Sequence, residues 1–411
     1  MHPLVDTISG TLGRDAGDWV YVPVDVPPGV SRLDVQYRYD RPDVETGEFG
    51  NACDIGIFDE RGYSGVAGFR GWSGGARTRF FISGAAATPG YLPGPVNPGR
   101  WHVLLAPYHV AAAGLRYEID VSLTFGADEP TPAPHYPAER VGPSGTRWVR
   151  GDCHLHTVHS DGARTPGQLA AAARAGGLDF VVSTDHNTTS SHRQWAAHAC
   201  DDLLIGLGEE STTRNGHWLA LGLPPETVIE WRFRADGDGF AAAVERVHER
   251  GGLAVAAHPF APCLGCRFKH DLADADVVEV WNGPWTLDDE AAVLAWDNLL
   301  VAGRPHWLPA PPVGIGGQLP VSDDALIDVH LRVEGVADGL MLLVTDQGVV
   351  RRARCDAAGH GELRWHTSAG RSRYVRAEVR HPGTDDDDSN ALPGPMAAMT
   401  NPIWLGGPAR D

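Results

Sequence analysis

The chain has 411 residues, a hydrophobic content of 42% and a formal net charge of −19, with 50 glycines and 31 prolines. This length accommodates two or three hydrophobic cores, and the acidity argues against a nucleic acid or a membrane surface as a partner. Lys269 is the only lysine, which nearly excludes lysine-based covalent catalysis. No apolar segment follows Met1, and no apolar run approaches about eighteen residues. Six cysteines fit a reducing compartment, so we expect a cytoplasmic protein without a disulfide framework.

Residues 1–147 contain short apolar or alternating runs separated by Gly- and Pro-rich turns. The runs at 19–24, 33–37, 54–58, 79–82, 101–105 and 117–121 predict strands, and their spacing predicts a β-sandwich. In this region Gly71-Trp72-Ser73-Gly74-Gly75 has the pattern of a nucleophilic serine. That chemistry needs a turn between a strand and a helix, whereas Ser73 precedes a strand, so we do not expect it to be a nucleophile.

The pattern changes after a proline-rich linker that begins at residue 129. A strand through His154 is followed by a helix over 166–175, with Thr165 as N-cap and Pro166 at the first helical position. The remaining elements are expected at 179–184, 190–200, 203–208, 217–223, 239–250, 253–257, 277–281 and 288–302. Repeating β/α units imply parallel strands, and in such folds the active site gathers at the C-terminal ends of the strands.

Candidate metal ligands collect at the ends of these expected strands. His154 and His156 are two residues apart, so in a strand they share one face. Independent histidines have no reason to gather at one end of successive strands. The set therefore predicts a metal centre of imidazoles and carboxylates, which suits Zn, Mn or Fe. Its members are His154, His156, Asp161, His186, Glu210, His217 and His258.

Five motifs in this region resemble the PHP (polymerase and histidinol phosphatase) family, and within it the CehA/McbA-like metallohydrolases. They are His154-Leu155-His156-Thr157, Ser160-Asp161-Gly162, Thr184-Asp185-His186-Asn187, Gly208-Glu209-Glu210-Ser211-Thr212 and His258-Pro259. Residues 71–75, 88–91 and 400–404 are similar to that subfamily as well. The resemblance implies a distorted (β/α)7 barrel that holds two or three divalent metal ions.

The resemblance also implies roles for these residues. His154 and His156 would bind one metal, and Glu210, which matches the family's glutamate better than Glu209, would bridge to a second. The other implied ligands are His217 and His258 at the second metal, and Asp161 and His186 at a third position.

In a two-metal site a metal-bridging hydroxide attacks phosphorus or an ester carbonyl. Asp185 or His159 could relay the proton, and Asp185 could instead orient a ligand histidine. Arg164, Arg193 and Arg267 are candidates for binding a phosphate.

The family pattern breaks after the helix expected at 288–302. The family has one more strand there, ending in a Gly-Gly-Ser-Asp-x-His motif that supplies two ligands, but residues 299–312 contain neither. Asp328-Val329-His330 has the right spacing, yet it lies in an alternating strand whose polar face we expect to be solvated; His306 is another candidate replacement. We therefore expect a barrel without its closing strand and a weakened activity. The C-terminal β region or a second subunit could cover the exposed edge.

The sequence thus predicts a multidomain α/β plus β protein. The expected organisation is a β-sandwich over 1–147, a PHP-type barrel over 148–305, a Pro/Gly-rich linker over 306–320 and a small C-terminal β region over 321–411. Cys263-Leu264-Gly265-Cys266 is compatible with a zinc knuckle or a redox pair, and we favour a plain loop. For Asp385-Asp386-Asp387-Asp388 we favour a solvated loop over a calcium site, because the alternating ligand spacing is missing.

The expected function is a metal-dependent hydrolase acting on a small phosphoester. A carboxylic or carbamate ester hydrolase using the same site is the first alternative. The second is an impaired or non-catalytic metal-binding scaffold, which the missing closing motif supports. A homo-oligomer is compatible with either.

Overall fold

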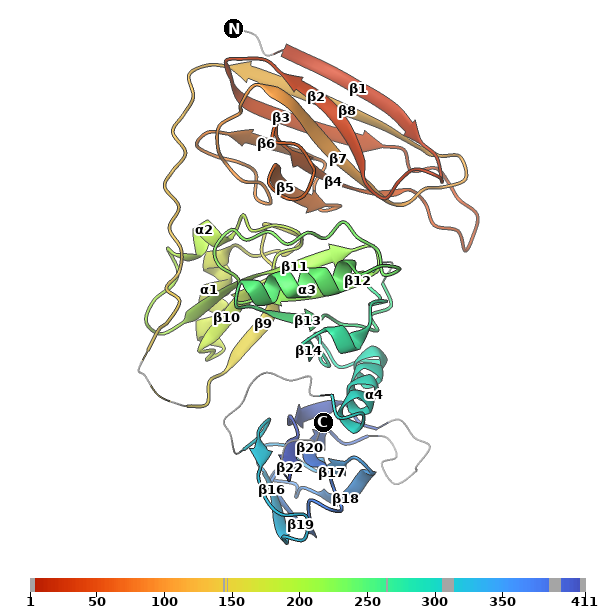
Figure 1. The fold of residues 1–411 in the computed structure, drawn as a ribbon, viewed down its shortest axis with the longest axis vertical. Coiled ribbons are helices and arrows are strands. Elements are labelled where there is room, and N and C mark those ends of the chain that lie inside the picture. Colours follow the sequence, from red (N-terminus) through yellow and green to blue (C-terminus); the bar gives the residue numbers. More distant parts are fainter. Residues whose placement is uncertain are drawn as a thin grey trace. The chain divides into compact units, whose positions relative to one another are not determined.

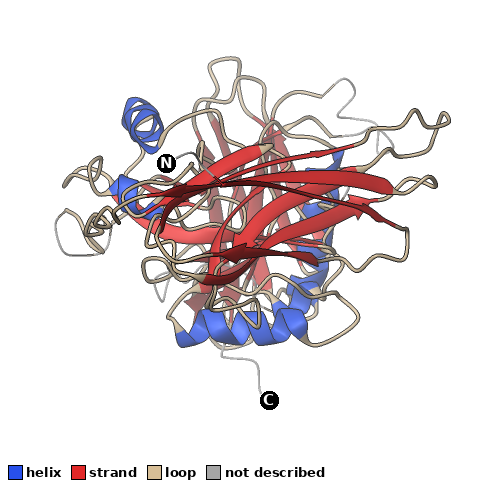
Figure 2. Cartoon of the chain, turned by 90° about the horizontal axis from the view of Figure 1, so that it is seen from above, coloured by secondary structure: helices blue, strands red, loops and turns tan. Residues whose placement is uncertain are grey.

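The computed structural model describes residues 4–142, 145, 147–263, 265–304, 314–383 and 393–406. The chain divides into two compact units (Figure 1). The first consists of Met1–Ala257 with Cys263–His270, and the second of His258–Pro262 with Asp271–Asp411. Strands greatly outnumber helices in both (Figure 2). Every helix in the described ranges is too short or too polar to cross a membrane.

Residues 4–125 contain two four-stranded antiparallel sheets. One has the order β1-β8-β3-β6 and the other β2-β7-β4-β5. Their strands are β1 (Leu4–Leu12), β2 (Val20–Val26), β3 (Val30–Tyr39), β4 (Ala52–Phe58), β5 (Phe69–Gly74), β6 (Arg79–Ser83), β7 (Gly99–His109) and β8 (Leu115–Phe125).

Alternation places the apolar side chains of both sheets in one hydrophobic cluster. In β3, for example, Leu33, Val35 and Tyr37 are at most 2% exposed, while Asp34 and Gln36 point the other way. The six runs predicted as strands correspond to β2, β3, β4, β6, β7 and β8. β1 and β5 have no counterpart in the prediction: β1 is largely exposed along its length, and β5 is short and Gly-interrupted.

The α/β part of the first unit is one mixed sheet with the order β13-β12-β11-β10-β9. Its strands are β9 (Gly151–Leu155), β10 (Phe180–Ser183), β11 (Leu204–Thr213), β12 (Gly216–Leu221) and β13 (Leu253–Ala256), and its helices are α1 (Pro166–Ala175), α2 (His192–Trp195) and α3 (Gly239–Glu249). The helix predicted over 166–175 is confirmed with its capping box between Thr165 and Gln168.

The expectation of parallel strands holds only for β9, β10 and β11. β12 runs antiparallel to both β11 and β13, because the chain turns back at once after Thr213. A short turn can join only antiparallel neighbours, whereas a parallel pair needs a crossover. The N-terminal end of β12 therefore lies at the same edge of the sheet as the C-terminal ends of its neighbours.

The second unit consists of the 3-10 turn η1 (Leu272–Asp274), helix α4 (Leu287–Val301) and short sheets. Its strands are β14 (Val277–Val278), β15 (Gln318–Leu319), β16 (Ile327–Val333), β17 (Leu340–Thr345), β18 (Gly348–Arg354), β19 (Gly361–Thr367), β20 (Tyr374–Arg380), β21 (Met396–Met399) and β22 (Ile403–Leu405). α4 packs on β20 through Trp296, Leu300 and Tyr374.

Asp328 and His330 lie on the exposed face of β16, as expected for an alternating strand. Asp328 is hydrogen-bonded to His366 of β19, and His330 Nε2 lies 3.4 Å from Glu362 Oε2. The segment proposed to have lost the closing barrel strand overlaps residues 305–313. Residues 305–313, which include His306, and the run Asp385-Asp386-Asp387-Asp388 lie outside the described residues.

Candidate metal centre

Four histidines and one glutamate of the first unit meet at one edge of the mixed sheet. His154 belongs to β9, His156 follows it by two residues, and His186 follows the end of β10. Glu210 lies in β11, and His217 is the second residue of β12, directly after the turn. The reversed direction of β12 is thus what brings His217 to the edge where the other strands end.

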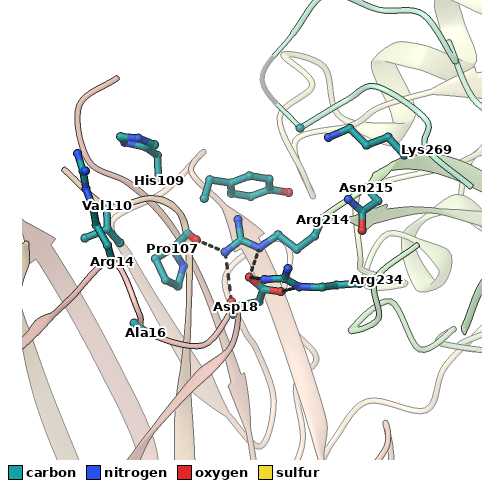
Figure 3. Close-up of a pocket in the computed structure, with 12 residues that line it drawn as sticks. Arg14, Ala16, Asp18, Pro107, His109, Val110, Arg214, Asn215, Arg234 and Lys269 are labelled. Carbon is teal, nitrogen blue, oxygen red and sulfur yellow. Dashed lines mark hydrogen bonds and ion pairs between the residues drawn. The ribbon is translucent and has the colours of Figure 1, made fainter. Parts of the chain in front are cut away.

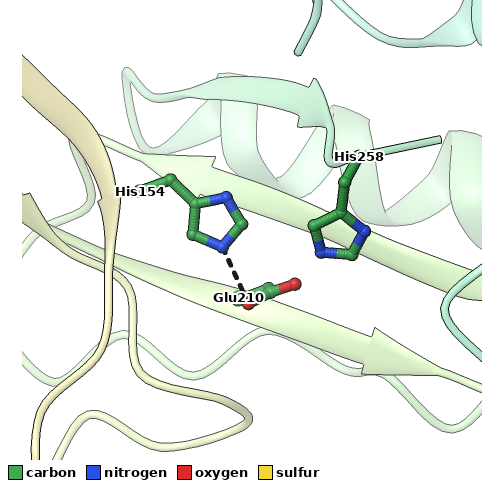
Figure 4. Close-up of side chains that lie close together, drawn as sticks. All are labelled: His154, Glu210 and His258. Atoms are coloured by element: carbon green, nitrogen blue, oxygen red, sulfur yellow. Dashed lines mark hydrogen bonds and ion pairs between the residues drawn. The ribbon is translucent and has the colours of Figure 1, made fainter. Parts of the chain in front are cut away.

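Glu210 is the centre of this group, and its side chain is fully buried. Its Oε2 lies 3.0 Å from His154 Nε2 and 3.1 Å from His156 Nε2. The same oxygen is 3.2 Å from His186 Nδ1, and Oε1 is 2.9 Å from His217 Nδ1. Figure 4 draws the contact between His154 and Glu210. One carboxylate therefore faces four imidazoles.

The protonation states in the group are strongly coupled. Burial acts to raise the pKa of Glu210, but the surrounding imidazoles outweigh it and hold this pKa well below its ordinary value. Burial lowers the pKa of His186 to about 4. At His156 burial acts to lower the pKa, but contact with Glu210 leaves it raised. The carboxylate is thus ionised and at least one imidazole is neutral, as metal ligation requires.

The donor atoms fit a divalent metal ion. Ligand atoms of His156, His186 and Glu210 all lie within 4.8 Å of one another. The Nε2 atoms of His154 and His156 are 3.2 Å apart, so at most one of them can donate a hydrogen to the other. His156 Nδ1 is buried and, within the described part of the chain, has no hydrogen-bond partner. Imidazole and carboxylate together suit Zn, Mn and Fe.

Two further predicted ligands lie at the margin of this group. The Asp161 side chain is 60% exposed, with Oδ2 3.7 Å from His186 Nε2 and Oδ1 3.9 Å from His156 Nδ1. His258 follows Ala257 at the start of the second unit and is the third side chain drawn in Figure 4. The amide of Ala257 donates to the carbonyl of His217 at 3.3 Å. His258 itself has a φ of +26°, a strained conformation for a non-glycine residue.

The structure does not support Asp185 as a free proton relay. Its Oδ1 accepts hydrogen bonds from the Thr157 amide at 2.7 Å and from Ser160 Oγ at 2.8 Å. Its Oδ2 accepts from Thr157 Oγ1 at 2.8 Å. The carboxylate is 1% exposed, and its acceptors are used by the loop that follows His156. Asp185 therefore holds this loop in place, and a part in proton transfer or in orienting a ligand histidine stays a prediction.

The other predicted catalytic and phosphate-binding residues lie away from Glu210. His159 is buried with its Nδ1 2.7 Å from Ser190 Oγ, and burial lowers its pKa. Arg193 is paired with Glu226, with NH2 2.9 Å from Oε2. Arg164 and Arg267 have exposed side chains. None of these four residues lines the pocket described next.

A pocket of about 410 Å³ opens beside the metal-binding residues. One wall comes from the mixed sheet and its loops and contains Ser160, Asp161, His186, Thr212 and His217. The other wall comes from β4, β5 and β7 and contains Asp54, Trp72, Ser73, Gly74, Gly75, Ala76 and Tyr108, and Cys266 completes the lining. This size suits a small molecule.

Sequence reasoning singled out residues 71–75 of the second wall by resemblance alone, and it missed Asp54 and Tyr108, because no motif marks them. Thr212 stood in a quoted motif, and the structure gives it a role: its Oγ1 lies 2.7 Å from His186 Nδ1. Ser73 lies within β5 itself, whereas the sequence placed it before a strand, and its Oγ lies 2.9 Å from the Tyr91 hydroxyl.

Glycines at the motifs over 71–75 and 88–91 let this wall approach the metal-site loops. Gly90 donates to Ser190 Oγ at 3.0 Å and its carbonyl accepts from Thr188 Oγ1 at 2.9 Å. A Cβ on Gly90 would lie 2.7 Å from the Trp72 carbonyl oxygen and 2.9 Å from that of His159. Only glycine allows so close an approach of backbones.

One prediction near the pocket is corrected. The structure pairs Cys263 with Cys266, with Cα atoms 5.4 Å apart, where the sequence favoured a plain loop without a disulfide. Gly265, at a φ of +88°, makes the turn that brings the two cysteines together.

Comparisons with known proteins give partial matches. No protein-family model matches the chain. An uncharacterized protein of Methanocaldococcus jannaschii is 29% identical over 157 residues, which is 33% of this chain and 82% of that protein. A solved structure from Bifidobacterium adolescentis, named as a candidate metal-dependent phosphoesterase, is 24% identical and covers 35% of this chain and 82% of its own, with a TM-score of 0.27.

A second solved structure is a two-domain protein from Bacteroides vulgatus, whose name includes a predicted PHP-like metal-dependent phosphoesterase. It is 17% identical and covers 67% of this chain and 100% of its own, with a TM-score of 0.30. At TM-scores this low, the function has to be argued from the geometry of the site itself.

Proposed function

We propose that this protein is a metal-dependent hydrolase that cleaves a small phosphoester. The observation that carries the proposal is the buried Glu210 carboxylate, which has nitrogen atoms of four imidazoles within 3.2 Å. Divalent ions held by such donors lower the pKa of bound water towards about 7 and stabilise negative charge on phosphoryl oxygens. The pocket beside these donors is large enough for a small ester.

The proposed ligand set extends the group around Glu210 by two residues. His258 is included because Ala257, one peptide bond away, is hydrogen-bonded to His217. Asp161 is included because its carboxylate oxygens lie 3.7 and 3.9 Å from two of the imidazoles. We propose that Glu210 bridges two ions, since each of its oxygens faces a different histidine set. Asp185 holds the loop after His156 in position beside this group by accepting a hydrogen bond from the Thr157 amide.

A carboxylic or carbamate ester is the second candidate substrate, and one observation favours it. The described residues that line the pocket include neither arginine nor lysine. A phosphomonoester dianion would thus depend on the metal ions alone for charge compensation, whereas a neutral ester would not.

The test compares Glu210→Gln with Glu209→Gln. Glu209 is equally buried, but it lies on the opposite face of β11, with Oε2 3.5 Å from the Ile229 amide. Burial raises the pKa of Glu209 to about 8, so glutamine resembles its neutral form and the variant is a matched control. Protein purified without chelator is analysed for bound metals and assayed on 4-nitrophenyl phosphate and 4-nitrophenyl acetate.

Wild type and the Glu209 variant should hold about two metal ions per chain and hydrolyse one of the esters. The Glu210 variant should lose at least one ion and more activity than the ~10–100-fold that a residue supporting a ligand contributes. Bound metal without hydrolysis of either ester would leave the non-catalytic scaffold. A metal content below about one in the wild type, unchanged by either substitution, would contradict the proposal.

A further inference from the structure

Asp54 is the charged residue in the pocket wall that β4, β5 and β7 contribute. It lies in β4, opposite Ala106 of β7, and its side chain is close to the turn at Gly74 and Gly75. The metal-binding side chains lie on the facing wall of the same pocket. A ligand that reaches the metal ions with one end therefore has Asp54 available to its other end.

The Asp54 carboxylate has no hydrogen-bond donor in the part of the chain that the structure describes. Among the described residues no N–H or O–H group donates to either of its oxygens, although its neighbours are largely buried. Arg214 is the nearest source of positive charge, but it is engaged elsewhere. In an adjoining cavity of about 630 Å³ its guanidinium donates to the Pro107 carbonyl and contacts Asp18, which also binds Arg234 (Figure 3).

A half-buried carboxylate without donors is costly unless a ligand compensates it. Burial raises the pKa of Asp54 to about 7, against the opposite influence of Arg214. The groups around it do not supply charge: Cys53 and Tyr108 are neutral, because burial raises the pKa of the Cys53 thiol to about 12 and that of the Tyr108 hydroxyl beyond its ordinary range. The missing partner is a cation or a hydrogen-bond donor.

The rest of the lining suits the same kind of ligand. Trp72 and Tyr108 offer aromatic surface next to Asp54, and Ser73 and Thr212 carry the hydroxyl groups. Aromatic rings and a carboxylate together favour ammonium groups. With no arginine or lysine in the lining, this end of the pocket rejects a second anionic group.

We propose that Asp54 is a specificity-determining residue that binds an ammonium or N–H donor group on the organic part of the substrate. This inference rests on the proposed function, since it assumes that the reacting ester lies at the metal-binding wall. It narrows the substrate class to small aminoalkyl or amino-substituted esters.

The test measures binding, so that it does not depend on turnover. Metal-loaded wild-type protein is titrated calorimetrically with 2-aminoethylphosphonate and 3-aminopropylphosphonate, and with propylphosphonate and butylphosphonate, in which a methyl group replaces the ammonium group. The phosphonate end represents the reacting group in hydrolysis of either ester class, and the two chain lengths bracket the reach across the pocket. Asp54→Asn keeps the shape of the side chain, and Asp25→Asn, an exposed aspartate on β2, is the control for net charge.

We expect at least one aminoalkyl phosphonate to bind the wild type at least tenfold more tightly than its alkyl counterpart. The Asp54 variant should lose this preference while its affinity for the alkyl phosphonates stays within twofold, and the Asp25 variant should keep it. Equal affinities within both pairs, or no binding of any phosphonate, would overturn the inference. Absence of ester hydrolysis with the preference intact would instead contradict the proposed function and leave Asp54 as a recognition residue.

Discussion

At the scale of single residues, hydrogen bonds distinguish the histidines of the metal centre from the others. His192 is as buried as any of them, but its Nε2 donates to the Gly208 carbonyl at 3.0 Å and its Nδ1 accepts from the Glu226 amide at 3.1 Å. Burial lowers its pKa to about 4, so it stays neutral and has no lone pair left for a metal. His156, in contrast, keeps a buried nitrogen without a partner in the described chain.

A substitution of Asp185 distinguishes two roles of this residue, holding the loop after His156 in place and transferring a proton. Asp185→Asn leaves one acceptor oxygen for three donor groups from Thr157 and Ser160. We expect activity to fall by about 10–100-fold and the free energy of unfolding by about 1–3 kcal/mol. The shape of the pH–rate profile should not change, because the residue supports a loop and transfers no proton. The measurements are the pH dependence of kcat/KM and denaturant-induced unfolding.

Asp179→Asn is the control for this variant. Asp179 accepts from the Arg150 amide at 2.8 Å at a half-buried position before β10, where a single hydrogen bond is at stake, so its loss should affect neither activity nor stability by much. Loss of one limb of the pH–rate profile in the Asp185 variant alone would restore the relay role that the sequence suggested.

The sequence could predict the metal-binding wall of the site but not the opposite wall. His154, His156, His186, Glu210 and His217 each stand beside a predicted strand end, so periodicity alone brings them to one edge. Asp54 and Tyr108 come from the earlier strands β4 and β7, and only tertiary packing brings them to the pocket. The roles of Asp185 and His159 were also out of reach, because they depend on which donors lie within 3 Å.

At the scale of elements, two backbone features assemble the site. The first is the immediate turn from β11 to β12, which makes β12 antiparallel and carries His217 to the metal-binding edge. The sequence predicted both strands but not their relative direction. A hairpin has a short connection and a crossover a long one, and the predicted strand bounds did not fix the length of this connection. The second is the glycine-rich approach of β5 and residues 88–91 to the loop after β10.

The close approach of residues 88–91 to the site predicts that one added methyl group at Gly90 lowers both stability and activity. Gly90→Ala places a Cβ 2.7 Å from the Trp72 carbonyl oxygen, and the residue already has a φ of +101°. Gly47→Ala is the matched control, with a φ of +96° and nothing within 4 Å of the added Cβ. We expect a loss of about 1 kcal/mol in the control, from the backbone conformation alone. The Gly90 variant should lose at least twice as much and also lose activity.

Thermal unfolding and steady-state assays of the two variants check this expectation. The difference between them isolates the steric contact, because the conformational cost of a positive φ is common to both. Equal stabilities and unchanged activity in the two proteins would mean that the approach of Gly90 to Trp72 and Ser190 does not shape the site.

At the scale of the whole molecule, the two units differ from the predicted domain boundaries. The first unit joins the N-terminal sheets with β9–β13, and the second includes α4 with the C-terminal strands. Sequence periodicity located α4 almost correctly, at 288–302 against Leu287–Val301, but assigned it to the barrel. Ion pairs with buried arginines connect α4 to β20, and neither hydrophobic periodicity nor helix propensity reveals such pairs. Arg376 NH2 lies 2.9 Å from Asp297, and Arg380 NH2 lies 3.1 Å from Glu290.

Glu378 is the middle of this charge network, and its removal should destabilise the second unit. Its oxygens accept from Arg376 NH1 at 2.6 Å and Arg380 NH2 at 2.8 Å, and all three side chains are at most 7% exposed. Glu378→Gln leaves two buried guanidinium groups with one carboxylate partner each, which we expect to cost about 3 kcal/mol. Glu362→Gln, at a side chain that is 49% exposed, should cost far less stability than Glu378→Gln, because exposed ion pairs are screened by water.

The loss of stability caused by Glu378→Gln should depend on pH in a defined direction. Burial acts to raise the pKa of Glu378, but the two arginines outweigh it and leave the pKa lowered in the folded protein. A carboxyl whose pKa is lower in the folded than in the unfolded state stabilises above the unfolded value, and this contribution disappears as the pH falls through the folded value. The difference between wild type and Glu378→Gln should therefore be largest near neutral pH and shrink below about pH 4. Scanning calorimetry from pH 3 to 8 measures it, and a difference that grows on acidification, or a Glu362 variant that matches the Glu378 variant, would contradict the network's role.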